Sequence, residues 1–92
     1  EIEGLINDLP GVAESAVVGV PHPDFGEGVI AVVVPQAGQT LDGAQLVSAL
    51  KGRIANFKVP KHVFVVDELP RNAMGKVQKN VLRSHHQDLF AA

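Results

Sequence analysis

The chain has 92 residues, a net charge of −2, 46% hydrophobic residues and no cysteine. This length predicts one small domain, and the lack of cysteine excludes disulfides and cysteine-based metal sites. No hydrophobic run is long enough to span a membrane and no signal peptide is visible, so we expect a cytoplasmic protein. Because the sequence starts inside a predicted helix without a methionine, we expect it to be a piece of a larger protein.

Charge is distributed unevenly along the chain. Residues 1–50 contain seven acidic residues and no lysine or arginine, whereas residues 51–92 contain eight basic and three acidic residues. A basic cluster beside a Gly-Lys loop suits a partner that carries phosphates. A dipolar surface without any ligand explains the charge pattern equally well.

The first half of the chain predicts a helix followed by two strands. Four apolar residues, at positions 2, 5, 6 and 9, follow helical spacing, and Pro10-Gly11 ends the helix. The apolar runs 15–20 and 29–34 predict strands. Between them, residues 21–28 hold two prolines and two glycines, which predict a turn without regular structure. This connection is short enough to make the two strands antiparallel neighbours.

The second half predicts helix, strand and helix. The first of these helices spans about 43–56 and is capped by Thr40 or Asp42. A strand at 62–66 and a helix at about 79–89 complete the pattern. We therefore expect an α+β domain, with a small, mainly antiparallel three-stranded sheet packed with helices.

The loop between the last strand and the last helix ends on a lysine, Lys76. Its sequence is Leu-Pro-Arg-Asn-Ala-Met-Gly-Lys. Pro70 restricts the backbone where the chain leaves the strand, and Gly75 can adopt angles closed to other residues. A loop held between two ordered elements can carry Lys76 to a fixed place, although a solvated turn is the simpler interpretation of Gly-Lys alone.

The chain lacks most parts of a self-sufficient enzyme. It has no paired carboxylates at acid–base spacing and no recognisable Ser/His/Asp arrangement. Val77 follows Lys76, whereas a phosphate-binding P-loop requires serine or threonine there. We therefore predict that Lys76 completes a site made elsewhere by stabilising charge that develops in a transition state.

Two loop aromatics, Phe25 and Phe57, are further candidates, together with Lys58 and Lys61. The rings could stack on a nucleotide base while the lysines contact phosphates. We predict no metal site. His22 has no partner at metal-ligand spacing, and two adjacent histidines at 85 and 86 point about 100° apart on a helix.

Three segments together resemble the C-terminal domain of adenylate-forming enzymes. They are the Pro-x4-Gly-Lys segment at 70–76, Lys-Val-Pro-Lys at 58–61, and the run from 9 to 23. The resemblance covers almost the whole chain. This superfamily includes acyl-CoA synthetases, firefly-luciferase-like enzymes and the adenylation domains of nonribosomal peptide synthetases. The segment 69–80 looks most similar to malonyl-CoA or methylmalonyl-CoA synthetases, which implies that residues 1–92 are the C-terminal lid domain of such an enzyme.

The resemblance implies a reaction in two steps and a role for each candidate residue. An acid and ATP give acyl-AMP and pyrophosphate, and CoA then converts acyl-AMP to acyl-CoA and AMP. Lys76 matches the adenylation lysine of the family. Phe25, Phe57, Lys58 and Lys61 fall where some members hold the CoA nucleotide, although Val59 replaces an arginine found in some relatives. ATP and Mg²⁺ are expected to bind mainly to an N-terminal domain, so the chain alone should be inactive.

The resemblance also implies regulation. In many bacterial relatives a protein acetyltransferase acetylates this lysine and a deacetylase restores it, and acetylation removes the charge of Lys76. We expect no nucleic-acid or membrane partner. Two alternatives remain: the lid of a nonribosomal peptide synthetase adenylation domain, or a phosphate- or nucleic-acid-binding module. The second is disfavoured because Phe64 is the only aromatic residue in the predicted strands.

Overall fold

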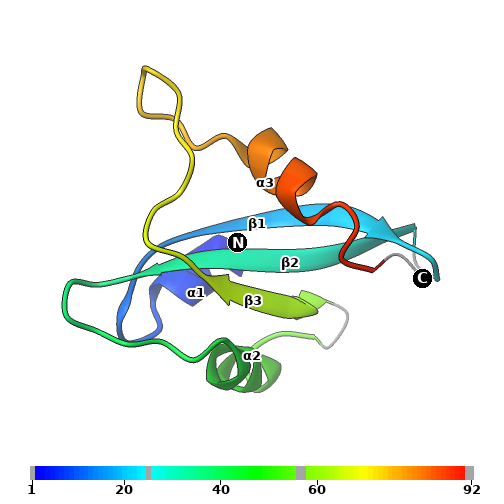
Figure 1. The fold of residues 1–92 in the computed structure, drawn as a ribbon. Coiled ribbons are helices and arrows are strands. Elements are labelled where there is room, and N and C mark those ends of the chain that lie inside the picture. Colours follow the sequence, from blue (N-terminus) through cyan, green and yellow to red (C-terminus); the bar gives the residue numbers. More distant parts are fainter. Residues whose placement is uncertain (1, 25, 56–57, 91–92) are drawn as a thin grey trace.

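The computed structural model describes residues 2–24, 26–55 and 58–90. Within these ranges the chain forms a three-stranded sheet with helices on both faces, α1 and α2 on one side and α3 on the other (Figure 1). The expected α+β class is therefore confirmed. The elements in chain order are α1 (Ile2–Asn7), β1 (Val12–His22), β2 (Gly26–Pro35), α2 (Gly43–Lys51), β3 (His62–Val65) and α3 (Lys79–His86).

The sheet has the order β1-β2-β3 and is mixed. The long β1–β2 pairing is antiparallel, as expected, but β3 pairs with β2 in parallel. The parallel pairing arises because the connection from β2 to β3 runs through α2, and a crossover of this length returns the chain in the same direction. The backbone N–H of Val66 donates to the carbonyl of Val33, so the pairing extends just beyond β3.

The hairpin between β1 and β2 is tighter than the sequence predicts. We expected an irregular turn over 21–28, but β1 continues through His22 and β2 begins at Gly26. Pro21 lies opposite Glu27 in the ladder. A proline is tolerated there because β1 is an edge strand. Gly26 takes a positive φ of 75°, which lets the chain reverse within a few residues.

The helices are shorter than their apolar patterns suggest. Asp42, one of the two expected caps, begins α2, and its carboxylate accepts a hydrogen bond from the Ala44 backbone N–H at 2.9 Å. The helix ends at Lys51 with Gly52 as its C-cap, and does not continue to residue 56. Glycine favours this ending because it destabilises helix interiors. Helix α3 is also shorter than expected and ends at His86, with Gln87 as its C-cap. No helix in the described ranges is both long enough and apolar enough to cross a membrane.

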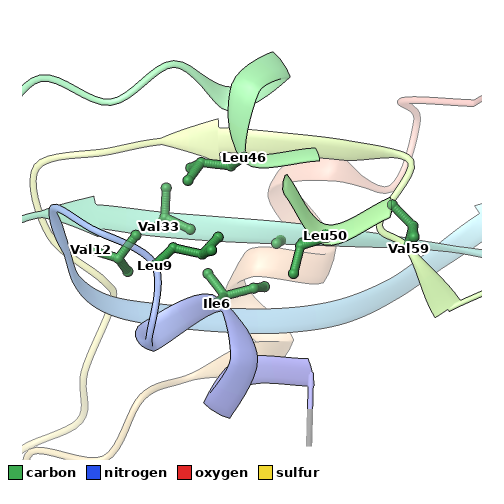
Figure 2. Close-up of a cluster of buried hydrophobic side chains, with 8 residues drawn as sticks. Ile6, Leu9, Val12, Val33, Leu46, Leu50 and Val59 are labelled. Carbon is green, nitrogen blue, oxygen red and sulfur yellow. The ribbon is translucent and has the colours of Figure 1, made fainter. Parts of the chain in front are cut away.

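Two hydrophobic clusters lie on opposite faces of the sheet. The first fills the space between the sheet, α1 and α2 (Figure 2). Its buried members are Ile6, Leu9, Val12, Ala31, Val33, Leu46, Leu50 and Val59. The second lies under α3 and contains Ala16, Val18, Val20, Ile30, Val32, Val34, Leu69 and Leu82. Consecutive residues of β2 alternate between the clusters, so the central strand is buried on both sides and reads as an unbroken apolar run.

A row of rings closes the α3 side of the sheet. Phe64 stacks on His86 with centroids 4.4 Å apart, and His62 lies 5.9 Å from both Phe64 and Phe90. Phe90 in turn contacts His22 at 4.8 Å. Partial burial, with a smaller contribution from the neighbouring histidine, lowers the pKa of His86. The described residues contain no group of three or more potential metal ligands.

Candidate functional site

The candidate site is an arm, residues 69–78, that leaves the sheet after β3 and projects outward before α3 begins (Figure 1). Its two ends are anchored in the cluster under α3. Leu69 is 4% exposed, and Val77 packs against the same cluster. Between these anchors every residue from Arg71 to Lys76 is exposed. Hydrophobic packing therefore fixes the base of the arm, whereas its exposed tip can be held only by polar contacts.

The backbone of the arm closes on itself. Arg71 and Val77 form an antiparallel bridge, and the N–H of Gln78 donates to the carbonyl of Pro70 at 2.8 Å. Gly75 has a φ of +82°, a left-handed conformation that costs a residue with a side chain free energy. The expected role of glycine at this turn is thus confirmed.

Asn72 organises the tip of the arm. Its Oδ1 accepts hydrogen bonds from the backbone N–H groups of Met74 at 2.9 Å and Lys76 at 3.0 Å. Its own backbone N–H donates to the carbonyl of Lys76, and its carbonyl accepts from the N–H of Gly75, both at 3.0 Å. The sequence interpretation overlooked this residue. Asparagine does commonly bond the backbone two residues further on.

Arg71 ties the arm to the sheet. One guanidinium nitrogen donates to the carbonyl of Gly75 at 2.8 Å, and another forms an ion pair with Glu14 of β1. Both side chains of the pair are partly exposed, at 40% and 38%. The ion pair is therefore a modest constraint, but it connects residues that no local sequence pattern could relate.

Lys76 presents its ammonium group from this ordered backbone. Its N–H and its carbonyl are both hydrogen-bonded within the arm. Its side chain is exposed, and it has no hydrogen-bond or ion-pair partner within the ranges that the structure describes. The arm therefore carries a positive charge that no described neighbour neutralises, on a backbone that is held in place.

The second candidate group lies at the other end of β3. Lys58 and Lys61 flank Val59 and Pro60, which are both buried, and both lysines are exposed. Figure 1 shows this segment entering β3, whereas the arm leaves it. The structure thus separates these lysines from Lys76 within the domain.

Lys58 and Lys61 also line different grooves. Lys58 lies beside α1, in a groove that it shares with Leu5 and Asp8. Lys61 lines a groove between α2 and β3 that also contains Lys51. The two predicted stacking residues, Phe25 and Phe57, lie outside the described residues. Their proposed contacts with a nucleotide base stay predictions.

A glutamate that the sequence interpretation did not single out anchors the start of α3. Glu3 Oε2 accepts a hydrogen bond from the Val17 N–H at 2.7 Å and pairs with the Lys79 ammonium at 3.0 Å. Partial burial disfavours its charge, but these two partners outweigh that effect and lower the pKa of Glu3. This contact joins α1, β1 and α3 just beyond the arm.

Comparison with known proteins assigns the chain to a family. The family model described as the AMP-binding enzyme C-terminal domain matches residues 1–76. The chain belongs to this family. Its match ends on Lys76, and the glycine and lysine of the arm lie within it.

The proteins to which the chain is similar include several acyl-CoA ligases. The chain is 52% identical to indoleacetate–CoA ligase of Aromatoleum aromaticum over 83 residues, which cover 90% of the chain and 16% of that protein. It is 42% identical to 3-methylmercaptopropionyl-CoA ligase of Ruegeria pomeroyi over 98% of the chain and 17% of that protein.

Solved structures of related proteins also resemble this chain. The ATP-bound MatB structure from Rhodopseudomonas palustris matches with a TM-score of 0.92 and 60% identity, covering 97% of this chain and 18% of that one. The chain therefore spans less than a fifth of the length of the proteins that it resembles.

Proposed function

We propose that residues 1–92 are the C-terminal lid domain of an AMP-forming acyl-CoA synthetase, and that Lys76 is its adenylation lysine. The observation that supports this proposal is the ammonium of Lys76, exposed and unpaired within the described ranges, at the tip of a hydrogen-bonded arm. Membership of the AMP-binding enzyme C-terminal family supplies the reaction class.

The chemistry explains why such a lysine is needed. In the first step a carboxylate oxygen attacks the α-phosphorus of ATP and pyrophosphate leaves, so two anions must approach each other. An ammonium beside both offsets their repulsion, and it does so most effectively where water is excluded. In the second step the thiol sulfur of CoA attacks the acyl carbon and AMP leaves. The lysine is not required in that step.

ATP and Mg²⁺ are assigned mainly to an N-terminal domain of the same polypeptide, and CoA is assigned in part to this domain. Lys58 and Lys61 are exposed and suit its phosphates, while Phe25 and Phe57 would stack on its adenine. Val59, which stands where some relatives carry arginine, is 6% exposed and belongs to the hydrophobic core. We therefore assign it no phosphate contact.

The proposed acid is malonate or methylmalonate. The resemblance of residues 69–80 to malonyl-CoA and methylmalonyl-CoA synthetases supports this choice. The named relatives use other acids, so the choice depends on residues of the N-terminal domain. A nonribosomal peptide synthetase lid would use the same arm, and its acid-binding domain would distinguish it.

Regulatory acetylation of Lys76 is part of the proposal. Its exposed side chain is open to a protein acetyltransferase, and a deacetylase would restore the amine. An acetyl group removes the positive charge and should stop adenylation. We also assign the complete enzyme to the cytoplasm, where ATP and CoA are available.

The test is Lys76→Ala in the complete enzyme. We expect acyl-AMP formation, measured by ATP–pyrophosphate exchange, to fall by roughly 10² to 10³, as for the loss of one transition-state charge contact. Thioester formation from supplied acyl-AMP and CoA should be largely spared. Lys51→Ala, which removes another exposed lysine, is the matched control for the first step.

Equal damage to both half-reactions would refute the assigned role. The isolated 92-residue chain is expected to show no synthetase activity, because the ATP and acid pockets are assigned to the other domain. Turnover by this chain alone would contradict the proposed division of the enzyme.

A further inference from the structure

We infer that Asn72 is a positioning residue that sets the location of the Lys76 ammonium for adenylation; the inference rests on the proposed function. No hydrogen bond joins the side chains of Asn72 and Lys76, both of which lie within the described ranges. Instead, three of its polar atoms bond the backbone of residues 74–76. The function of the lysine would then depend on a neutral side chain four positions earlier.

Two of these bonds involve Lys76 itself. Its N–H donates to the side-chain Oδ1 of Asn72, and its carbonyl accepts from the backbone N–H of Asn72, each at 3.0 Å. The Gln78 side chain also donates to that carbonyl, at a longer 3.2 Å. No other residue in the described ranges bonds both backbone groups of Lys76. Asn72 therefore determines the direction in which the lysine side chain leaves the backbone.

Asn72 makes most of the hydrogen bonds at the tip of the arm. All side chains from Arg71 to Lys76 are exposed, so no hydrophobic contact fixes them. Gly75 adds conformational freedom to the chain once its neighbours are released. Arg71 bonds Glu14 and the carbonyl of Gly75, which belongs to the same peptide unit as the Lys76 N–H. It therefore supports that peptide unit as well, but it makes no bond to the N–H or the carbonyl of Lys76. Removing the Asn72 side chain deletes the bonds to the N–H groups of Met74 and Lys76 and should loosen the lysine while the base of the arm stays in place.

The experiment compares three variants of the complete enzyme. Asn72→Ala removes the acceptor, Asn72→Asp keeps an oxygen that accepts both N–H groups, and Asn80→Ala removes an exposed asparagine of α3 that makes no such bonds. We expect Asn72→Ala to lower kcat for acyl-AMP formation by roughly 10- to 100-fold, the effect of misplacing a catalytic group by about 1 Å. KM for ATP and for the acid should change little.

Three further readouts separate positioning from a general structural role. Thioester formation from supplied acyl-AMP should match the wild type in Asn72→Ala. Amide hydrogen exchange in a peptide covering residues 70–78 should increase, with β1 and β2 unchanged. Asn72→Asp should recover most of the adenylation rate, and Asn80→Ala should retain all of it.

A double variant provides the sharpest test. If Asn72 acts only through the lysine, Asn72→Ala combined with Lys76→Ala should be no slower than Lys76→Ala alone, since coupled residues are not additive. Additive losses, or equal losses in both half-reactions, would overturn the inference. So would a wild-type adenylation rate in Asn72→Ala when Lys76→Ala is slow, and that result would leave the proposed function intact. A wild-type rate in Lys76→Ala would overturn both.

Discussion

The two lysine-bearing segments at the ends of β3 are held in opposite ways. The segment entering the strand is anchored by burial: Val59 is 6% exposed and Pro60 is fully buried, while Lys58 and Lys61 extend to solvent on either side. The arm leaving the strand has no buried residue between Pro70 and Val77, and its own hydrogen bonds hold it. The proposed role requires the arm to enter another domain, so its side chains are not available to pack in its own core. Polar contacts within the arm then replace that packing.

Burial should dominate the stability of the domain. Val59→Ala removes two methyl groups from the first cluster and leaves a cavity, so we expect the free energy of unfolding to fall by about 1–3 kcal/mol. The measurement is urea denaturation of the 92-residue chain. Met74→Ala on the arm is the control, because Met74 is 92% exposed and should change stability by no more than about 0.5 kcal/mol. Equal losses in the two variants would show that burial does not distinguish the segments.

Two glycines with similar backbone conformations, Gly75 and Gly26, should differ in their importance for activity although their substitution has similar effects on stability. Gly75→Ala introduces a side chain at a φ of +82° with no atom within 4 Å of the new Cβ, so strain is its only cost. We expect a loss of about 1–2 kcal/mol. Gly26→Ala is a matched control, with a φ of +75° and equally open surroundings.

Only the substitution on the arm should also affect chemistry. Both variants should shift the urea midpoint of the domain by similar amounts. In the complete enzyme, Gly75→Ala should slow ATP–pyrophosphate exchange and Gly26→Ala should not. A similar slowing in both would mean that the arm carries no special geometric requirement.

The smallest expected effect concerns pH and the base of α3. The pKa of Glu3 lies below its ordinary value near 4.5, so the folded state favours its carboxylate. The stability that it contributes is present above the unfolded pKa and is lost as pH falls through the folded pKa. The effect is small because the Glu3 and Lys79 side chains are 34% and 42% exposed.

Urea midpoints measured from pH 7 down to about pH 3 test this contribution. Glu3→Gln should flatten the acid side of the profile, whereas Glu68→Gln, at an exposed position after β3, should leave it unchanged. An unchanged acid slope in Glu3→Gln would exclude the Glu3–Lys79 contact as its origin.

Much of the fold follows from local patterns in the sequence. The apolar spacing of Leu46 and Leu50 identifies α2, and unbroken valine runs identify strands that are covered on both faces. The ends of elements were predicted less well. β1 continues through Pro21 because its partner strand is still in register there, a non-local condition that a local proline count overlooks.

In the candidate site, too, features with a local sequence signal could be predicted and features that depend on the tertiary fold could not. Lys76 could be found from the Pro-x4-Gly-Lys spacing, which lies within ten residues. The role of Asn72 had a local signal, the preference of asparagine for bonding a nearby backbone, and was still overlooked. The Arg71–Glu14 ion pair had no such signal, because it joins the arm to β1 through the tertiary fold.

The self-contained bonding of the arm has a consequence for how the complete enzyme can be followed. The proposed reaction uses Lys76 in the first step and not in the second, and we propose that the lid moves between these steps. A lysine on a flexible loop would then move independently of its domain. Here the arm is bonded within itself and to β1, so Lys76 travels with the sheet. A fluorescent or spin label on an exposed residue of α3, such as Arg83, would therefore report the position of the arm at each stage of the reaction.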